Sequence, residues 1–86
     1  MKGQVALVKE QGVRFAVVVV KQSTLQGPKH SQNESAAAFS THFGMPAVLM
    51  AQDSRGRATY YGRPDIVRFL SHLYVEQLPW GDFWIN

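Results

Sequence analysis

Two uninterrupted apolar runs dominate the hydrophobic pattern of this chain. Residues 13–20 read VRFAVVVV, and residues 47–51 read AVLMA. Branched β-carbons favour strands because they pack well on a pleated sheet. An apolar run without polar alternation is typical of a strand that is covered on both faces. We therefore predict two central strands, at residues 13–20 and 47–51.

The segment before the first run, residues 4–9, is open to two interpretations. It is a hairpin partner of residues 13–20, with Gly12 at positive φ in a short loop, or it is one or two frayed helical turns. The hairpin is favoured because Val5 and Val8 are β-branched and no helix cap precedes them.

A polar turn follows the second run. Asp53 suits the first position of a β-turn, and Gly56 suits the last. Residues 57–61 then read RATYY, which predicts a return strand. Two hairpins are thus expected, each built around a central strand.

Two segments have helical signals. Ser31 and Glu34 have the spacing of a capping box for a helix that runs to Phe43, and Gly44 suits the left-handed position after its last turn. Residues 22–30 before it predict a polar, mobile loop. The second helix starts at Pro64, which is favoured at the first helical position. Its apolar stripe consists of Ile66, Phe69, Leu70 and Leu73.

The resulting order is β-β-α-β-β-α plus an aromatic C-terminal tail. We expect one small α/β (α+β) domain, residues 1–86, with a mixed central sheet and two helices. A domain of this size buries only about 60–65% of the surface of its unfolded chain, so its stability is marginal. The chain has no cysteine and only three histidines, so disulfide and metal staples are not expected. Oligomerisation is therefore the remaining way for the chain to bury more of its surface.

The order of elements in residues 43–73 resembles the closing half of a thioredoxin-like domain. The resemblance rests on Gly44, Pro46, the strands 47–52 and 58–61, and the helix 64–73. It implies a truncated thioredoxin-like fold as the alternative architecture, and a cis bond between Met45 and Pro46, as in that family. Without cysteine, thiol–disulfide chemistry is excluded, so the resemblance concerns the fold and not an activity.

The strongest candidates for ligand binding are basic and aromatic residues around the second hairpin. Basic side chains interleaved with aromatic rings can hold phosphates and stack bases. The candidates are Arg55, Arg57, Tyr60, Tyr61, Arg63 and Arg68. They predict a nucleic-acid or small-anion site, although hairpin tips are also commonly charged for solubility alone.

The C-terminal tail is the second candidate. Trp80, Phe83, Trp84 and Ile85 fall within the last seven residues. Large apolar side chains are costly to leave in water, and aromatic residues are enriched in interface cores. The tail either covers the sheet of its own chain or docks on a neighbour, and the sequence leaves both open.

No catalytic constellation, phosphate loop or ligand set for a metal is visible, so we expect a non-enzymatic protein without cofactors. The net charge of +3 is modest. No signal peptide or membrane span is recognisable, which favours a cytoplasmic protein. The favoured function is an interaction or assembly module that forms a homodimer. The alternatives are a nucleic-acid or anion-binding protein and, less favoured, a small enzyme or ligand-binding protein with a pocket under residues 22–30.

Overall fold

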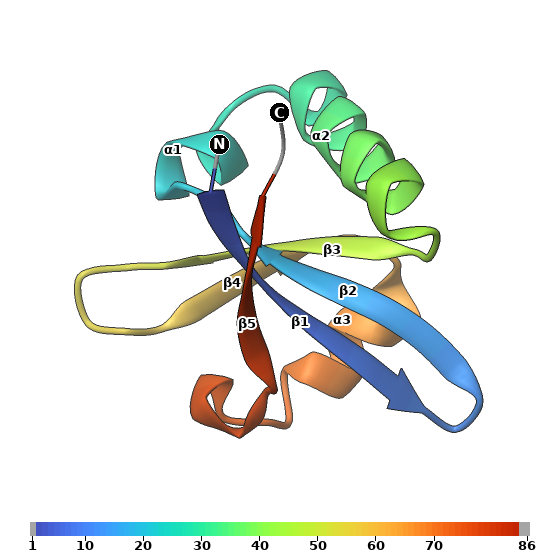
Figure 1. The fold of residues 1–86 in the computed structure, drawn as a ribbon. Helices are drawn as coiled ribbons and strands as arrows, with labels where there is room; N and C mark the ends of the chain where they lie inside the picture. The colour runs from blue at the N-terminus through green and yellow to red at the C-terminus, as the bar shows by residue number, and fades with distance from the viewer. Residues whose placement is uncertain (1, 85–86) are drawn as a thin grey trace.

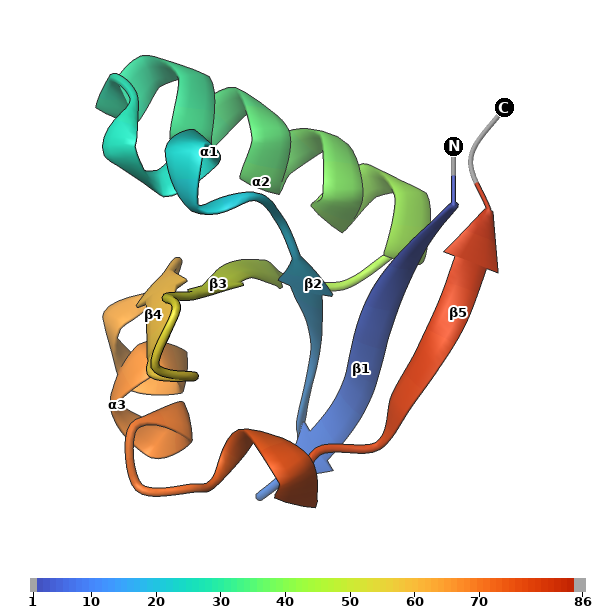
Figure 2. The ribbon, with the colours of Figure 1, turned by 90° about the vertical axis from the view of Figure 1, so that its left-hand side faces the viewer.

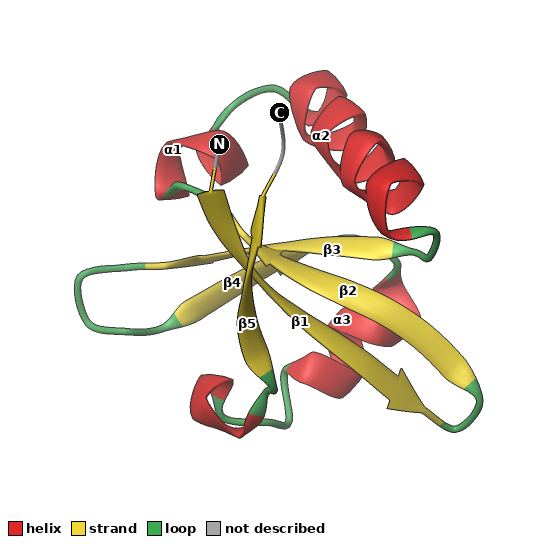
Figure 3. Ribbon diagram, viewed as in Figure 1, coloured by secondary structure: helices red, strands yellow, loops and turns green. Residues whose placement is uncertain are grey.

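The computed structural model describes residues 2–84 and contains five strands, three α-helices and one 3-10 turn within that range (Figures 1 and 3). In chain order they are β1 (Lys2–Glu10), β2 (Val13–Val19), α1 (Gln22–Gln26), α2 (Lys29–Phe43), β3 (Ala47–Gln52), β4 (Ala58–Tyr61), α3 (Pro64–Leu70), the 3-10 turn η1 (Val75–Gln77) and β5 (Trp80–Trp84).

The five strands form one mixed sheet in the order β4-β3-β2-β1-β5. The central strands β2 and β3 run parallel and are joined by the crossover through α1 and α2. The other neighbours, β1 with β2, β1 with β5 and β3 with β4, are antiparallel. The predicted α+β class, with a mixed sheet built on two central strands, is confirmed.

Helices cover both faces of the sheet, as Figure 2 shows, with α1 and α2 above the strands and α3 and η1 below. On the lower face, Ile66 and Leu70 of α3 pack with Val17, Val48 and other buried residues of the sheet. The upper face has a smaller core of Val5, Ala16, Val18 and Phe83, against which Phe39 and Phe43 of α2 pack. Both faces of β2 are therefore buried, as its unbroken run of valines predicts.

The hairpin interpretation of the N-terminal segment is confirmed. Residues 5–10 of β1 pair with residues 13–18 of β2. The connecting residues Gln11 and Gly12 both have positive φ, 50° and 79°. Two positive φ values in a two-residue loop match the right-handed twist of the flanking strands.

The prediction of a loop at residues 22–30 is wrong. Residues 22–26 form α1, and α2 already begins at Lys29. The buried side chain of Gln32 joins these helices, because its Nε2 donates to the carbonyl oxygens of Leu25 at 3.1 Å and Gly27 at 2.7 Å. This contact satisfies carbonyls that a short helix leaves unpaired at its end, which the local sequence does not reveal.

The capping box is also absent, since Ser31 is the third residue of α2 and the N-cap position is occupied by Pro28. The C-terminal end agrees with the prediction: Gly44 has φ 70° and its N–H donates to Ser40. The helix α3 starts at Pro64 as predicted but ends at Leu70 rather than Leu73.

The expected cis bond before Pro46 is not found. Among residues 2–84 every peptide bond is trans, so the prediction for Met45–Pro46 is wrong. Within the same range, no helix is long and apolar enough to span a membrane.

Candidate functional site

The basic and aromatic candidates of the second hairpin are divided between the two faces of the sheet. Successive side chains of a strand point to opposite faces, so Tyr60 and Tyr61 of β4 cannot line one surface. Tyr60 and Arg57 line a cavity of about 360 Å³ next to the end of α3 and η1. Tyr61 and Arg63 line another, of about 440 Å³, against α2. The sequence pattern placed these residues together, whereas the pleat of β4 separates the two tyrosines and the two arginines line different cavities.

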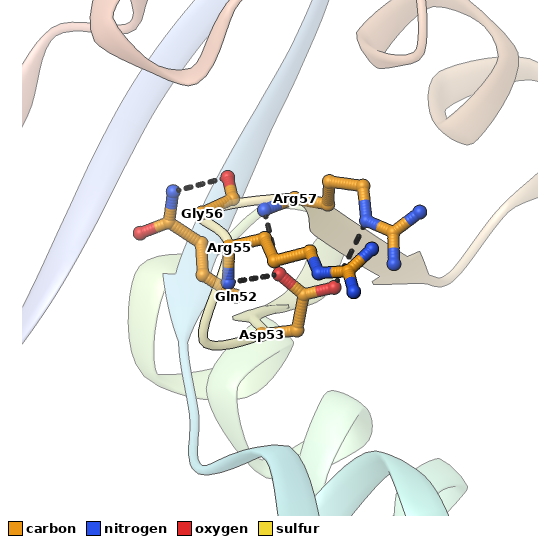
Figure 4. Close-up of polar contacts among 5 residues, drawn as sticks. All are labelled: Gln52, Asp53, Arg55, Gly56 and Arg57. Atoms are coloured by element: carbon orange, nitrogen blue, oxygen red, sulfur yellow. Dashed lines mark hydrogen bonds and ion pairs between the residues drawn. The ribbon is translucent and has the colours of Figure 1, made fainter.

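The side chain of Arg57 is bound to Asp53 within the turn that precedes β4 (Figure 4). Its Nε lies 3.1 Å from Oδ2 of Asp53, while Oδ1 of Asp53 accepts from the backbone N–H groups of Arg55 and Arg57 at 2.9 Å each. Gly56, with φ 81°, completes the turn. The backbone N–H of Arg57 is the main cause that lowers the pKa of the Asp53 carboxyl below its usual value. Asp53 thus acts as the anchor of the turn.

This arrangement predicts how the pKa of Asp53 responds to substitution. Because the main cause is a backbone N–H, Arg57→Gln should leave most of the lowering in place, and Arg55→Gln, the matched control, should change nothing. A depressed folded-state pKa means that the carboxylate stabilises the fold above the usual pKa of about 4, and that this stability is lost as the pH falls through the lowered value. An NMR titration of the Asp53 carboxyl measures its pKa in wild type and in both variants. A return to the usual pKa in Arg57→Gln would contradict the assignment of the lowering to the backbone N–H.

The side chains of the remaining arginines are not bound to Asp53. Arg63 forms a two-pronged ion pair with Asp65, with Nη2 2.8 Å from Oδ2 and Nε 3.2 Å from Oδ1. The Arg63 hydrogen bond is the main cause that lowers the pKa of the Asp65 carboxyl. Arg55 and Arg68 are exposed. Of the four candidate arginines, Arg57 and Arg63 thus already have carboxylate partners in their own chain. These partners weaken their attraction for an external anion.

The two tyrosines have different surroundings. The hydroxyl of Tyr60 is buried and has no hydrogen-bond partner among the described residues, and burial raises the pKa of this phenol. The Tyr61 hydroxyl instead donates to Oδ1 of Asn33 on α2. Tyr60 therefore serves mainly to fill the lower core, and Tyr61 joins β4 to α2.

The C-terminal tail is a strand of the sheet. It pairs with β1 from Lys2↔Trp84 to Ala6↔Trp80. Phe83 is buried in the upper core, and Trp80 is half-buried, with its Nε1 donating to the carbonyl of Val75 at 2.8 Å. Trp84 remains 69% exposed. Ile85, the fourth predicted interface residue, lies outside the described residues.

The sequence did not reveal a groove that the fold creates beside α1. It has a volume of about 690 Å³ and is lined by residues of β1, β2, α1, α2 and β5. These residues are far apart in the chain. The nearest expectation from the sequence was the less favoured alternative, a pocket under residues 22–30. Thr24, within that segment, and Lys21, directly before it, line the groove.

Among residues 2–84, His, Asp and Glu side chains do not gather in a group of three that could hold a metal ion. Comparisons with protein-family models, curated proteins and solved structures found no match. The resemblance to a thioredoxin-like closing half therefore stays a prediction, and any function has to be argued from the residues themselves.

Proposed function

We propose that this protein is a non-enzymatic assembly module that forms a homodimer through the outer edge of β5. The observation that carries the proposal is the position of β5: it ends the strand order, and its only neighbour among the described strands is β1. An edge strand presents a row of unpaired N–H and C=O groups, which another strand can satisfy. A second copy of β5 is one such strand.

The chemistry of the two sheet edges favours β5 over β4. Proteins protect edges with charged side chains, proline and short strands. The β4 edge has four residues and is flanked by Arg57 and Arg63. The β5 edge carries one charge, Asp82, which is paired with Lys2 of its own chain at 3.3 Å. Charge therefore protects the β5 edge less than the β4 edge against pairing with another strand.

Trp84 supplies apolar surface at this edge. It is one of the few large hydrophobic side chains that the described residues leave exposed, and its ring faces the ammonium of Lys2 at 5.5 Å. Burial of apolar surface contributes about 25 cal/mol per Å². In a two-fold dimer, one patch serves both partners, so the two Trp84 rings would be buried together.

The test is the mass in solution of the intact chain and of Trp84→Lys. The exposed position tolerates lysine, while the two new charges at a two-fold interface repel each other. We expect wild type to be a dimer at concentrations of tens of micromolar and Trp84→Lys to be a folded monomer, as measured by analytical ultracentrifugation and circular dichroism. The matched control is Tyr74→Lys, which changes another exposed aromatic residue, 77% exposed and outside β5, and should remain dimeric.

A wild-type monomer at such concentrations contradicts the proposal, and so does a dimer that survives Trp84→Lys.

The cellular location and the alternative function complete the proposal. A chain without cysteine suits a reducing compartment, and we therefore propose that the dimer works in the cytoplasm. Nucleic-acid or anion binding through the arginines and tyrosines of the second hairpin stays the alternative. It receives less support, because Arg57 and Arg63 have carboxylate partners and line cavities on opposite faces.

A further inference from the structure

The groove beside α1 has the shape and lining of a small-molecule site. Its volume of about 690 Å³ is within the range of about 300–1,000 Å³ that is usual for ligand pockets. The chain segments that meet there are the start of β1, the end of β2, α1, α2 and the end of β5.

The groove lies at the carboxyl end of a parallel strand. Val19 ends β2, and Val20 and Lys21 lead from it into α1; all three line the groove. In open sheets with parallel strands, ligands bind outside the carboxyl ends of these strands, at the point where the connections diverge. Here the groove lies outside the carboxyl end of β2, one of the two parallel strands, and next to the start of the antiparallel β1.

The apolar part of the lining comes from three segments. Val20 follows β2, Phe39 belongs to α2 and Phe83 to β5, and all three side chains pack in the upper core. Phe83 also lies over Gly3, where an added β-carbon would come within 2.6 Å of its ring. A ligand in this groove therefore needs an apolar body.

The charged residues of the lining are both cationic, Lys2 and Lys21. The ammonium of Lys2 is already paired with Asp82. Lys21 is exposed and forms no ion pair with the described residues. No acidic residue lines the groove, so charge complementarity favours an anion at the end next to Lys21.

We propose that the groove binds a small amphipathic carboxylate, with its hydrocarbon part against Val20, Phe39 and Phe83 and its carboxylate at Lys21. The proposal does not rest on the proposed dimer: Phe83 of β5 lines the groove, but Trp84, the residue on which the dimer test depends, does not. The helix α1 starts directly after Lys21 and lines the groove through Thr24.

The test uses decanoate as the probe, below its micelle concentration, with isothermal titration calorimetry and NMR shift mapping on the intact chain. We expect a Kd of about 1 mM or tighter, with shifts at Val20, Thr24 and Phe39. Decanol lacks the charge and acetate lacks the chain, so each should bind at least about tenfold more weakly, because charge-assisted hydrogen bonds and apolar burial both contribute.

Two variants locate the site. Lys21→Gln keeps an unbranched polar side chain but removes the charge, and should weaken decanoate about tenfold while leaving decanol unchanged. Ser35→Phe fills the groove from α2 and should abolish binding of both. The matched control, Lys9→Gln, removes the same charge from the far end of β1, outside the lining, and should bind like wild type.

Absence of decanoate binding at millimolar concentration would overturn the proposal. Equal weakening by Lys21→Gln and Lys9→Gln would overturn it as well, because the effect would then come from net charge alone. If Ser35→Phe is folded by circular dichroism and still binds decanoate, the ligand occupies another site and the proposal is overturned. The Trp84→Lys monomer should bind decanoate like wild type, which separates this result from the oligomeric state.

Discussion

Replacing Leu70 with alanine is expected to lower the free energy of unfolding by about 2–5 kcal/mol. Leu70 is completely buried, with an exposed fraction of 0%, in the lower core between α3 and the sheet, where Val17, Val48 and Ile66 are also buried. Removing its isopropyl group loses transfer free energy and leaves a cavity that packed neighbours fill only in part. For a domain of marginal stability, this is a large fraction of the total.

Urea denaturation followed by circular dichroism, at one fixed protein concentration, measures this loss. The matched control is Leu7→Ala, because Leu7 lies on β1 and is 52% exposed. Its loss should stay within about 0.5 kcal/mol, as for most exposed positions. If Leu70→Ala costs under about 0.5 kcal/mol, the stripe on α3 is not part of the core.

The second large effect is expected for Gly62→Ala, which should cost about 1–3 kcal/mol through overpacking. Gly62 connects β4 to α3. A β-carbon at this position would lie 2.8 Å from Cγ2 and 3.2 Å from Cα of Val48. Val48 is a buried residue of the central strand β3, so its backbone cannot move aside without disturbing the sheet.

Two other glycines serve as comparisons in the same denaturation measurement. Gly81 on β5 has no neighbour within 4 Å of an added β-carbon, so Gly81→Ala should be neutral or slightly stabilising. At Gly3 the clash is with the ring of Phe83, a side chain that can shift, and the cost should be lower than at Gly62. Equal stability of the Gly62 and Gly81 variants would show that β4 and β3 are not as closely packed as described.

Much of this fold follows from local sequence. The valines of β2 and the apolar run of β3 predict central strands, because only a strand covered on both faces can bury such side chains continuously. Gly12, Gly44 and Gly56 mark the ends of elements, and all three have positive φ. Pro64 begins α3 as its fixed φ predicts. These features depend on the conformational preference of one residue or on periodicity within one element.

The tertiary structure decided what depends on contacts between distant segments. Residues 22–26 are helical, although their polar sequence predicts a loop, and the side chain of Gln32 joins the end of this helix to α2. The aromatic tail became the fifth strand because the edge of β1 was open to it. Neither partner is visible from the local pattern, since both contacts join segments that the sequence separates.

The candidate site shows the same division. The sequence placed Arg57, Tyr60, Tyr61 and Arg63 in one group, whereas the pleat of β4 and two local carboxylates divide them. The groove at Lys21 is formed by five elements whose proximity exists only in the folded sheet. Composition and periodicity thus determined which segments are buried and where they turn. Which side chains share a surface was decided by strand order and register, because these arise from long-range pairing.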